Sequence, residues 1–100
     1  MVHNYIVVRE DLAPAQRVLQ GIHAALIARA TGANDNLVFL TAPDESTLAQ
    51  LGDKLEGDLR PYRYHEDEGE GTPERLNAIA FVGVHKEQRK HFRDLPMWRG

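Results

Sequence analysis

The chain of 100 residues contains no cysteine. This absence excludes disulfide bonds, thiolate nucleophiles and every zinc or iron–sulfur site that depends on cysteine ligands. It also fits a reducing compartment, so we expect a cytoplasmic protein. The sequence has no run of about 18 apolar residues and no apolar leader near its start. Neither membrane insertion nor secretion is therefore expected.

Neither sign of charge dominates the chain, which has twelve Lys and Arg residues and fifteen Asp and Glu residues, for a net charge of −3. This balance offers no global attraction for nucleic acid. The distribution is uneven, with eight of the twelve basic residues between Arg60 and Arg99 and five acids between Glu66 and Glu74. The hydrophobic share of 42% and the charged share of 27% are typical of a globular protein. We expect one domain over residues 1–100.

The first half of the chain alternates β-branched runs with helical periodicity. Residues 2–8 predict a strand, and the segment from Pro14 to Thr31 predicts a helix. The apolar stripe of this helix consists of Val18, Leu19, Ile22, Leu26 and Ala30. The continuous apolar run 37–40 is typical of a strand covered on both faces. A second helix follows, with Asp44 as its N-cap and Gly57 at its end.

Two further strands are predicted at residues 62–64 and 79–84, followed by a short helix at residues 87–93. The order β-α-β-α-β predicts parallel strands joined by helical crossovers. The link between the last two strands is too short for a helix, so the fourth strand is expected to run antiparallel. We therefore predict a three-layer α/β/α domain with a four-stranded mixed sheet covered by helices on both faces.

Short segments spread over nearly the whole chain match one known family. The segments are Val7-Val8-Arg9-Glu10-Asp11-Leu12 with Gln20 and His23-Ala24-Ala25, Leu37-Val38-Phe39-Leu40 with Ala42-Pro43-Asp44-Glu45, Asp67 with Gly69, and the run from Ala78 to Gly83. Together they resemble the type 2 peptidyl-tRNA hydrolases. The resemblance implies a small α/β domain, often a homodimer, that cleaves the ester between a peptide and tRNA.

The resemblance also implies site roles for single residues. His23 and Asp67 match active-site positions of the family. Family members usually carry a Gly-Lys pair at the start of the first helix, and that lysine is implicated in activity. Here Gln16 stands at the lysine position, and Arg17 points about 100° away around the helix. Thr72 is a shifted match for a threonine that follows the family's loop aspartate.

These residue types suit ester hydrolysis, which needs an activated water molecule, a stabilised oxyanion and a protonated leaving oxygen. His23 could shuttle a proton, because histidine is the side-chain type suited to proton transfer near neutral pH. Asp67 could orient the histidine or the water. Arg9 or Arg17 could hold a phosphate or stabilise the oxyanion.

The same residues can also be interpreted as purely structural or solvent-exposed. His23 also suits a core histidine whose ring nitrogens are hydrogen-bonded inside the fold. Asp67 lies in a run of acids, which is most often a solvated loop. Gln16 and Gln20 lie one helical turn apart, and they either face solvent or hydrogen-bond a ligand through their amides.

Three functions fit the sequence. The first is a divergent peptidyl-tRNA hydrolase, in which Lys86, Arg89 and Lys90 contact the tRNA backbone rather than simply forming a solvated helix face. The second is a non-catalytic protein of the same fold that binds or sequesters a nucleotide-like small molecule, for example as a phage anti-defence sponge. The third is an interaction protein with an apolar contact surface. No histidines have the spacing of a helical zinc site, so we expect no metal and no cofactor.

Overall fold

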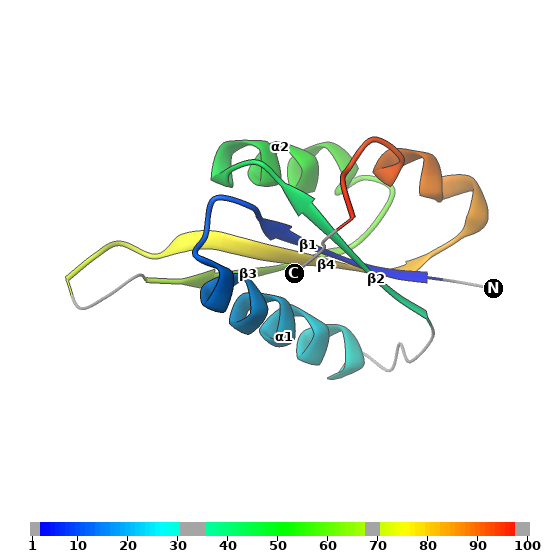
Figure 1. Ribbon diagram of the computed structural model, residues 1–100. Coiled ribbons are helices and arrows are strands. Elements are labelled where there is room, and N and C mark those ends of the chain that lie inside the picture. Colours follow the sequence, from blue (N-terminus) through cyan, green and yellow to red (C-terminus); the bar gives the residue numbers. More distant parts are fainter. Residues whose placement is uncertain (1–2, 31–35, 68–70, 98–100) are drawn as a thin grey trace.

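The sheet and its two helical layers agree with the prediction. The computed structural model describes residues 3–30, 36–67 and 71–97, so Gly69 of the family resemblance lies outside the described residues. Its elements are β1 (His3–Arg9), α1 (Pro14–Ala30), β2 (Asn36–Ala42), α2 (Glu45–Leu55), β3 (Pro61–Glu66), β4 (Arg75–Val84) and the 3₁₀ helix η1 (Lys86–Phe92). The strand order is β2-β1-β4-β3 (Figure 1). β2 runs parallel to β1, and β4 is antiparallel to β1 and β3, which confirms the mixed sheet with an antiparallel fourth strand.

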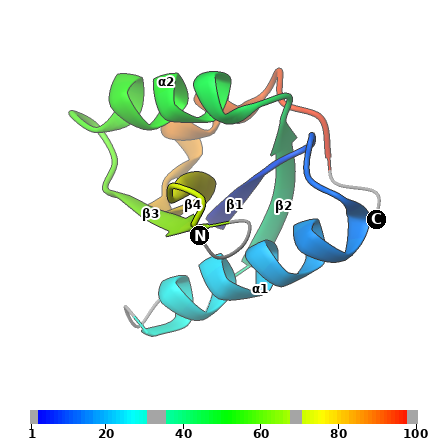
Figure 2. The same ribbon diagram turned by 90° about the vertical axis from the view of Figure 1, so that its left-hand side faces the viewer.

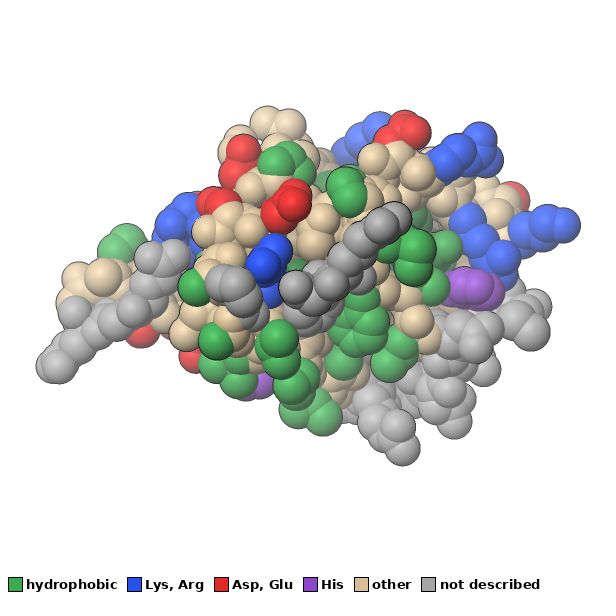
Figure 3. Space-filling model, viewed as in Figure 1, with side chains coloured by type: hydrophobic (Ala, Val, Ile, Leu, Met, Phe, Trp, Pro, Cys, Tyr) green, Lys and Arg blue, Asp and Glu red, His purple; other side chains and the backbone are tan. Residues whose placement is uncertain are grey.

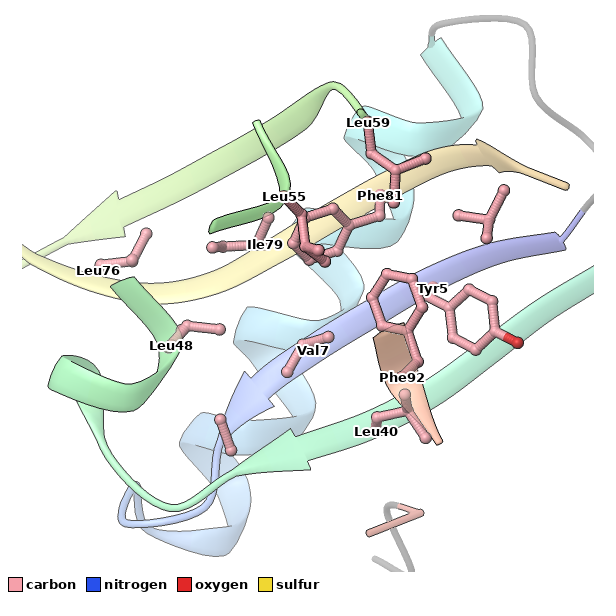
Figure 4. Close-up of a cluster of buried hydrophobic side chains, with 12 residues drawn as sticks. Tyr5, Val7, Leu40, Leu48, Leu55, Leu59, Leu76, Ile79, Phe81 and Phe92 are labelled. Carbon is pink, nitrogen blue, oxygen red and sulfur yellow. The ribbon is translucent and has the colours of Figure 1, made fainter. Parts of the chain in front are cut away.

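Helices cover both faces of the sheet (Figure 2). α2 and η1 lie over the larger cluster of buried side chains (Figure 4), which includes Val7, Leu48, Leu55, Ile79, Phe81 and Phe92. α1 covers the opposite face, where the buried side chains are smaller. They are Ile6, Val8, Ala24, Ala78 and Ala80. Among the described residues, no helix combines the length and the apolarity needed to cross a membrane.

The orientation of α1 is the opposite of what its apolar stripe indicates. The described members of the stripe are Val18, Leu19, Ile22 and Leu26, and they are between 40% and 58% exposed. Apolar side chains accordingly gather over α1 on the lower face in Figure 3. The side of α1 that faces the sheet carries Gln20 and Ala24, both almost fully buried. Alanines in α1 and β4 allow close packing here, and Gln20 has a carboxylate partner, so this polar face is the buried one.

β2 is an edge strand, and helical layers cover both of its faces in part, as expected. Val38 and Leu40 pack against the larger cluster, and Phe39 packs against the smaller cluster on the opposite face. Leu37 is 47% exposed, whereas Leu40 is 4% exposed. The segment after η1 covers part of the open edge, because Met97 pairs with Leu40 and the Thr41 N–H donates to the Pro96 carbonyl at 2.9 Å. Such covering protects an edge strand from pairing with other chains.

β4 starts at Arg75, earlier than the predicted start at Ile79. The pairing register between β3 and β4 shifts between Tyr64 and His65, so Asn77 is an extra residue in β4. This arrangement is a β-bulge, which interrupts the alternation of side chains along a strand. The interruption, together with the polar Asn77 itself, explains why the sequence pattern did not reveal the first part of β4.

Gly57 follows α2 as predicted, but it does not end the helix in the left-handed conformation. The described glycines with positive φ are Gly71 and Gly83. The chain leaves α2 through a hydrogen bond of 2.7 Å from the Leu59 N–H to the Leu55 carbonyl. Glycine is therefore not required at position 57.

Gly52 lies where α2 meets the sheet, and a Cβ there would lie 2.9 Å from Cδ1 of Ile79. We expect Gly52→Ala to lower the free energy of unfolding by about 1 kcal/mol, because overpacking outweighs the gain in helix propensity. Gly57→Ala is the matched control, since a Cβ added at position 57 would have no contact within 4 Å. It should be neutral or slightly stabilising. Urea denaturation measures both, and a more stable Gly52→Ala protein would refute this packing argument.

Glu45, the first residue of α2, ties this helix to the start of β4. Its carboxylate accepts hydrogen bonds from the Leu76 N–H at 2.8 Å and from Arg75 Nε at 3.2 Å. The hydrogen bond from Leu76 is the largest cause that lowers the pKa of Glu45 below its usual value of 4.5, and Arg75 adds to the effect. The folded protein therefore favours the ionised carboxylate.

A lowered pKa in the folded state adds stability above the unfolded pKa, and this stability is lost as the pH falls through the folded pKa. We expect Glu45→Gln to melt at a lower temperature than the wild type at about pH 7, and the difference to shrink towards zero at about pH 2. Glu10→Gln, on an exposed side chain, is the control. Thermal melts at both pH values measure the effect, and a difference that persists in acid would contradict it.

Candidate functional site

A cleft of about 490 Å³ opens where β1 ends and α1 begins. One wall is the β1–α1 turn with the first turns of α1, and the other is the end of β3 with the start of β4, towards the left of Figure 1. The cleft lies at the carboxyl end of β1, the edge at which open α/β sheets usually bind ligands. The lining residues are Asp11, Leu12, Ala13, Gln16, Leu19, Glu66, Asp67 and Asn77.

Arg9 supports the cleft from behind and is not among its lining residues. Its side chain is 2% exposed, and it holds Asp11 through two hydrogen bonds, Nε to Oδ1 at 2.9 Å and Nη2 to Oδ2 at 3.0 Å. Its Nη1 donates to Asn77 Oδ1 at 3.0 Å. The guanidinium thus joins the β1–α1 turn to β4. The prediction placed Arg9 on a ligand, but here its described partners are protein side chains.

Asn77 lines the cleft because it is the bulged residue of β4. A bulge re-aims a side chain that regular pleating would direct elsewhere. Besides accepting from Arg9, the Asn77 amide donates to the backbone carbonyl of Glu66 at 3.5 Å. The bulge therefore connects the Arg9 network to the end of β3.

Gln20 is buried, with 1% of its surface exposed, and it is not among the residues that line the cleft. Its Nε2 donates to the carboxylate of Glu66 and, at 3.4 Å, to Gln16 Oε1. Both partners line the cleft, and Gln16 is exposed to solvent there. Gln20 Oε1 is buried and has no hydrogen-bond partner among the described residues. Gln20 thus holds two lining residues, Gln16 and Glu66, in place through hydrogen bonds.

His23 does not line the cleft, so the structure does not place it with Asp67. Its ring packs edge-on against Tyr64, with 4.7 Å between the ring centroids, and its Nδ1 is buried without a partner in the described part of the chain. Burial, with a smaller contribution from Glu66, raises the pKa of the Tyr64 hydroxyl. Of the predicted catalytic pair, Asp67 alone is a lining residue.

Arg17 and Thr72, two further predicted ligand residues, are also absent from the lining. Arg17 is half-buried, and its Nε has no partner within the described ranges. Thr72 lies exposed in the loop between β3 and β4. The cleft wall therefore uses Gln16 of the first helix and not Arg17, in line with the rotation expected between neighbouring helical positions.

The predicted basic cluster lies at the other end of the sheet. Lys86, Arg89 and Lys90 belong to η1, which follows the end of β4 next to the start of β1. Figure 3 shows Lys and Arg side chains gathered around η1 at the right. Arg89 Nη2 lies 3.0 Å from Nδ1 of His3. The length of β1 separates this cluster from the cleft by about 20 Å.

Sequence reasoning missed Glu66 and Asn77 as lining residues and did not assign a site role to Asp11. Asp11 follows the first strand directly, which is the signal that could have identified it. Asn77 is a polar residue at the start of an apolar run, which is the usual mark of a bulge or a buried contact. Glu66 has no distinguishing signal, because it is one of five acids in the same segment.

The comparisons with known proteins add no relative, since no protein-family model and no curated protein matches the chain. The likeness to type 2 peptidyl-tRNA hydrolases therefore rests on the segments quoted above and on the kind of fold that they predicted.

Proposed function

We propose that the cleft binds the ester-bearing end of peptidyl-tRNA and that the protein hydrolyses this ester. The observation that carries the proposal is the lining of the cleft by the carboxylates of Asp11, Glu66 and Asp67. Carboxylates accept hydrogen bonds and repel phosphate. The terminal ribose hydroxyls and the peptide N–H groups of such a substrate are donors and carry no charge. They suit these walls, whereas a free nucleotide would bring its phosphates into them.

The position of the basic residues supports the same proposal. Lys86, Arg89 and Lys90 lie about 20 Å from the cleft, a distance that no small nucleotide spans. A tRNA is long enough to place its backbone on η1 while its acylated end enters the cleft. Two separated surfaces of opposite charge therefore fit a polymer with a phosphate backbone and an acylated terminal ribose that carries no charge of its own.

The chemistry assigns the activating role to Asp67. Its carboxylate takes a proton from a water molecule while the water oxygen attacks the acyl carbon. The positive end of the α1 dipole lies beside the cleft and favours the developing oxyanion. The bond to the ribose oxygen then breaks, and the proton held by Asp67 passes to that leaving oxygen. The products are a tRNA with a free hydroxyl and a peptide carboxylic acid, which then releases its proton to water.

A second candidate is binding without turnover. It is favoured by Gln16 at the family's lysine position and by the packing of His23 against Tyr64, outside the cleft. In this case the cleft would hold the donor-rich end of a ligand and leave its bonds intact.

The experiment is incubation of the purified protein with an N-blocked aminoacyl-tRNA, followed by measurement of the free tRNA released. Turnover above the uncatalysed rate supports the hydrolase. A folded protein that binds the acylated tRNA and releases none supports the second candidate. Absence of both binding and turnover would reject the two together. Binding should weaken steeply with salt if η1 contacts the tRNA backbone.

The family resemblance also leads us to propose a homodimer. The exposed stripe of α1 supports it, because Val18, Leu19, Ile22 and Leu26 carry no charge and can meet the same surface across a two-fold axis. Sedimentation equilibrium distinguishes a dimer from a monomer, and a monomer at high protein concentration would reject the proposal.

A further inference from the structure

The sheet has a second edge strand, β3, which pairs with β4 alone among the described strands. At the opposite edge Met97 pairs with β2, but no described segment outside the sheet pairs with β3. Figure 2 shows β3 at one border of the sheet, with α2 above the sheet and α1 below it. Every second residue of an edge strand directs its backbone N–H and carbonyl groups outwards. β3 therefore offers backbone hydrogen bonds to another strand.

The side chains of β3 on the α1 face follow a simple order. Tyr62 and Tyr64 pack against the smaller buried cluster on this face, and Glu66 accepts a hydrogen bond from Gln20 of α1. Arg60, directly before β3, stacks over the ring of Tyr62 with its guanidinium carbon 5.3 Å from the ring centroid. The α1 face of the edge thus carries a cation at one end, an anion at the other and two tyrosines between them.

This order is complementary to itself. A second copy of β3 can pair antiparallel across a two-fold axis that is normal to the sheet and passes through Arg63. Arg60 of each copy then lies opposite Glu66 of the other, and Tyr62 lies opposite Tyr64. Opposite charges and aromatic pairs at such positions stabilise strand pairing. Moving the axis to either neighbouring residue removes all of these pairs, so one register is favoured.

The opposite face of the edge does not oppose this pairing. Arg63 lies on the α2 face and meets its own copy at the axis. Its guanidinium is already bound by two acids of the α2 region, Asp53 and Glu56, at 3.2 Å each. The like charges at the axis are therefore compensated within each copy.

The exposed stripe of α1 flanks the same edge. Leu19 and Leu26 lie four residues before and three residues after His23, so they share its side of the helix. His23 contacts Tyr64 of β3. A pair of six-residue strands is only about 20 Å long, and a stable interface buries about 1,000 Å² or more. The same two-fold axis brings the stripes of two copies towards each other beneath the joined strands, which adds apolar area.

We propose that two copies pair through β3 about a two-fold axis at Arg63, so that their sheets form one continuous sheet, and that the partner's Arg60 completes the cleft of each copy. Glu66 lines the cleft, and the lining residues include no Lys or Arg. The partner's Arg60, opposite Glu66, supplies a guanidinium at the rim. The inference gives the proposed homodimer its interface, so it rests on that dimer but not on ester hydrolysis.

The absence of cysteine from the chain allows a direct test by cross-linking. Arg63→Cys places two thiols opposite each other at the axis, within reach of a disulfide bond, and mild oxidation should link most of the protein into covalent dimers. His65→Cys is the matched control, because this exposed residue lies on the same face but about 14 Å from its own copy. It should stay largely unlinked. Equal linking of the two variants, or linking of neither, would overturn the inference.

Sedimentation equilibrium of charge variants separates this interface from other dimers. We expect Arg60→Glu to weaken self-association at least tenfold, because two attractive pairs become repulsive. The control is Arg93→Glu, on an exposed residue at the end of η1, from which the chain runs to the β2 edge. It should associate like the wild type.

Folded Arg60→Glu that associates like the wild type would overturn this interface and leave the homodimer standing. A monomeric wild type would reject both, and the β3 edge would then be open to an extended segment of another protein. Failure of ester cleavage alone would reject the hydrolase and leave the β3 interface unaffected.

Discussion

Asp67→Asn is expected to lower kcat/KM for cleavage of a blocked aminoacyl-tRNA by about a hundredfold or more. The amide that replaces the carboxylate cannot take a proton from water, and general-base catalysis contributes roughly 10²–10⁴-fold to such reactions. Asp67 is exposed at the cleft, and no described residue holds it in a hydrogen bond. The substitution should therefore leave stability unchanged, and single-turnover kinetics at saturating protein measure the loss in the chemical step.

His23→Ala provides the comparison, because the sequence paired His23 with Asp67 and the structure does not. The ring of His23 contacts Tyr64 and is not among the lining residues. We expect this variant to lose stability while its kcat/KM stays well above that of Asp67→Asn. Equal losses in both variants, with the fold retained, would mean that the imidazole reaches the substrate and that the proposed role of Asp67 is incomplete.

Asp11→Ala is expected to lower the free energy of unfolding by about 2–3 kcal/mol. Arg9 is 2% exposed, and Asp11 supplies two of its hydrogen bonds. Removing the carboxylate leaves a buried guanidinium short of compensating charge, which is among the most costly effects of a single substitution. The estimate stays below that for a fully buried pair because Asp11 itself is 41% exposed. Chemical denaturation at neutral pH measures the change.

Glu10→Ala is the matched control for this prediction. Glu10 is the preceding residue, its side chain is exposed, and its N–H donates to the Ala42 carbonyl in a bond that the substitution keeps. Its effect should stay within about 0.5 kcal/mol. Similar stabilities for the two variants would show that the Arg9–Asp11 pair contributes little and that Asn77 suffices to hold Arg9.

The sequence was enough to predict the sheet because strand formation follows local pattern and the connection lengths restrict the topology. It did not predict the orientation of α1, because the apolar stripe of a surface helix usually faces the core and here its described members are exposed. The side chains that decide the orientation are Gln20 and Ala24, whose partners Glu66 and the β4 alanines are far away in sequence. The sequence of a helix shows which of its faces is apolar, but it does not show which residues from distant segments will pack against its polar face.

The cleft was only partly predictable for the same reason. Gln16 and Asp67 were expected at a ligand site, and both line the cleft. Arg9 was expected on a ligand but is turned to Asp11 and Asn77. The position of Asn77 depends on a one-residue shift in strand pairing. Such a shift depends on the geometry of two paired strands, so neither segment encodes it alone.

The central position of β1 has a consequence for how the chain folds. His3 pairs with Val84, and the contacts that build the cleft join residues 46 and 68 positions apart. Contacts this distant form late and slowly, because loop closure must precede them. The hydrogen bonds from Arg9 to Asn77 and from Gln20 to Glu66 therefore form only after β3 and β4 have joined the sheet. We expect folding intermediates to lack the cleft, so that the ability to bind appears only with the complete sheet.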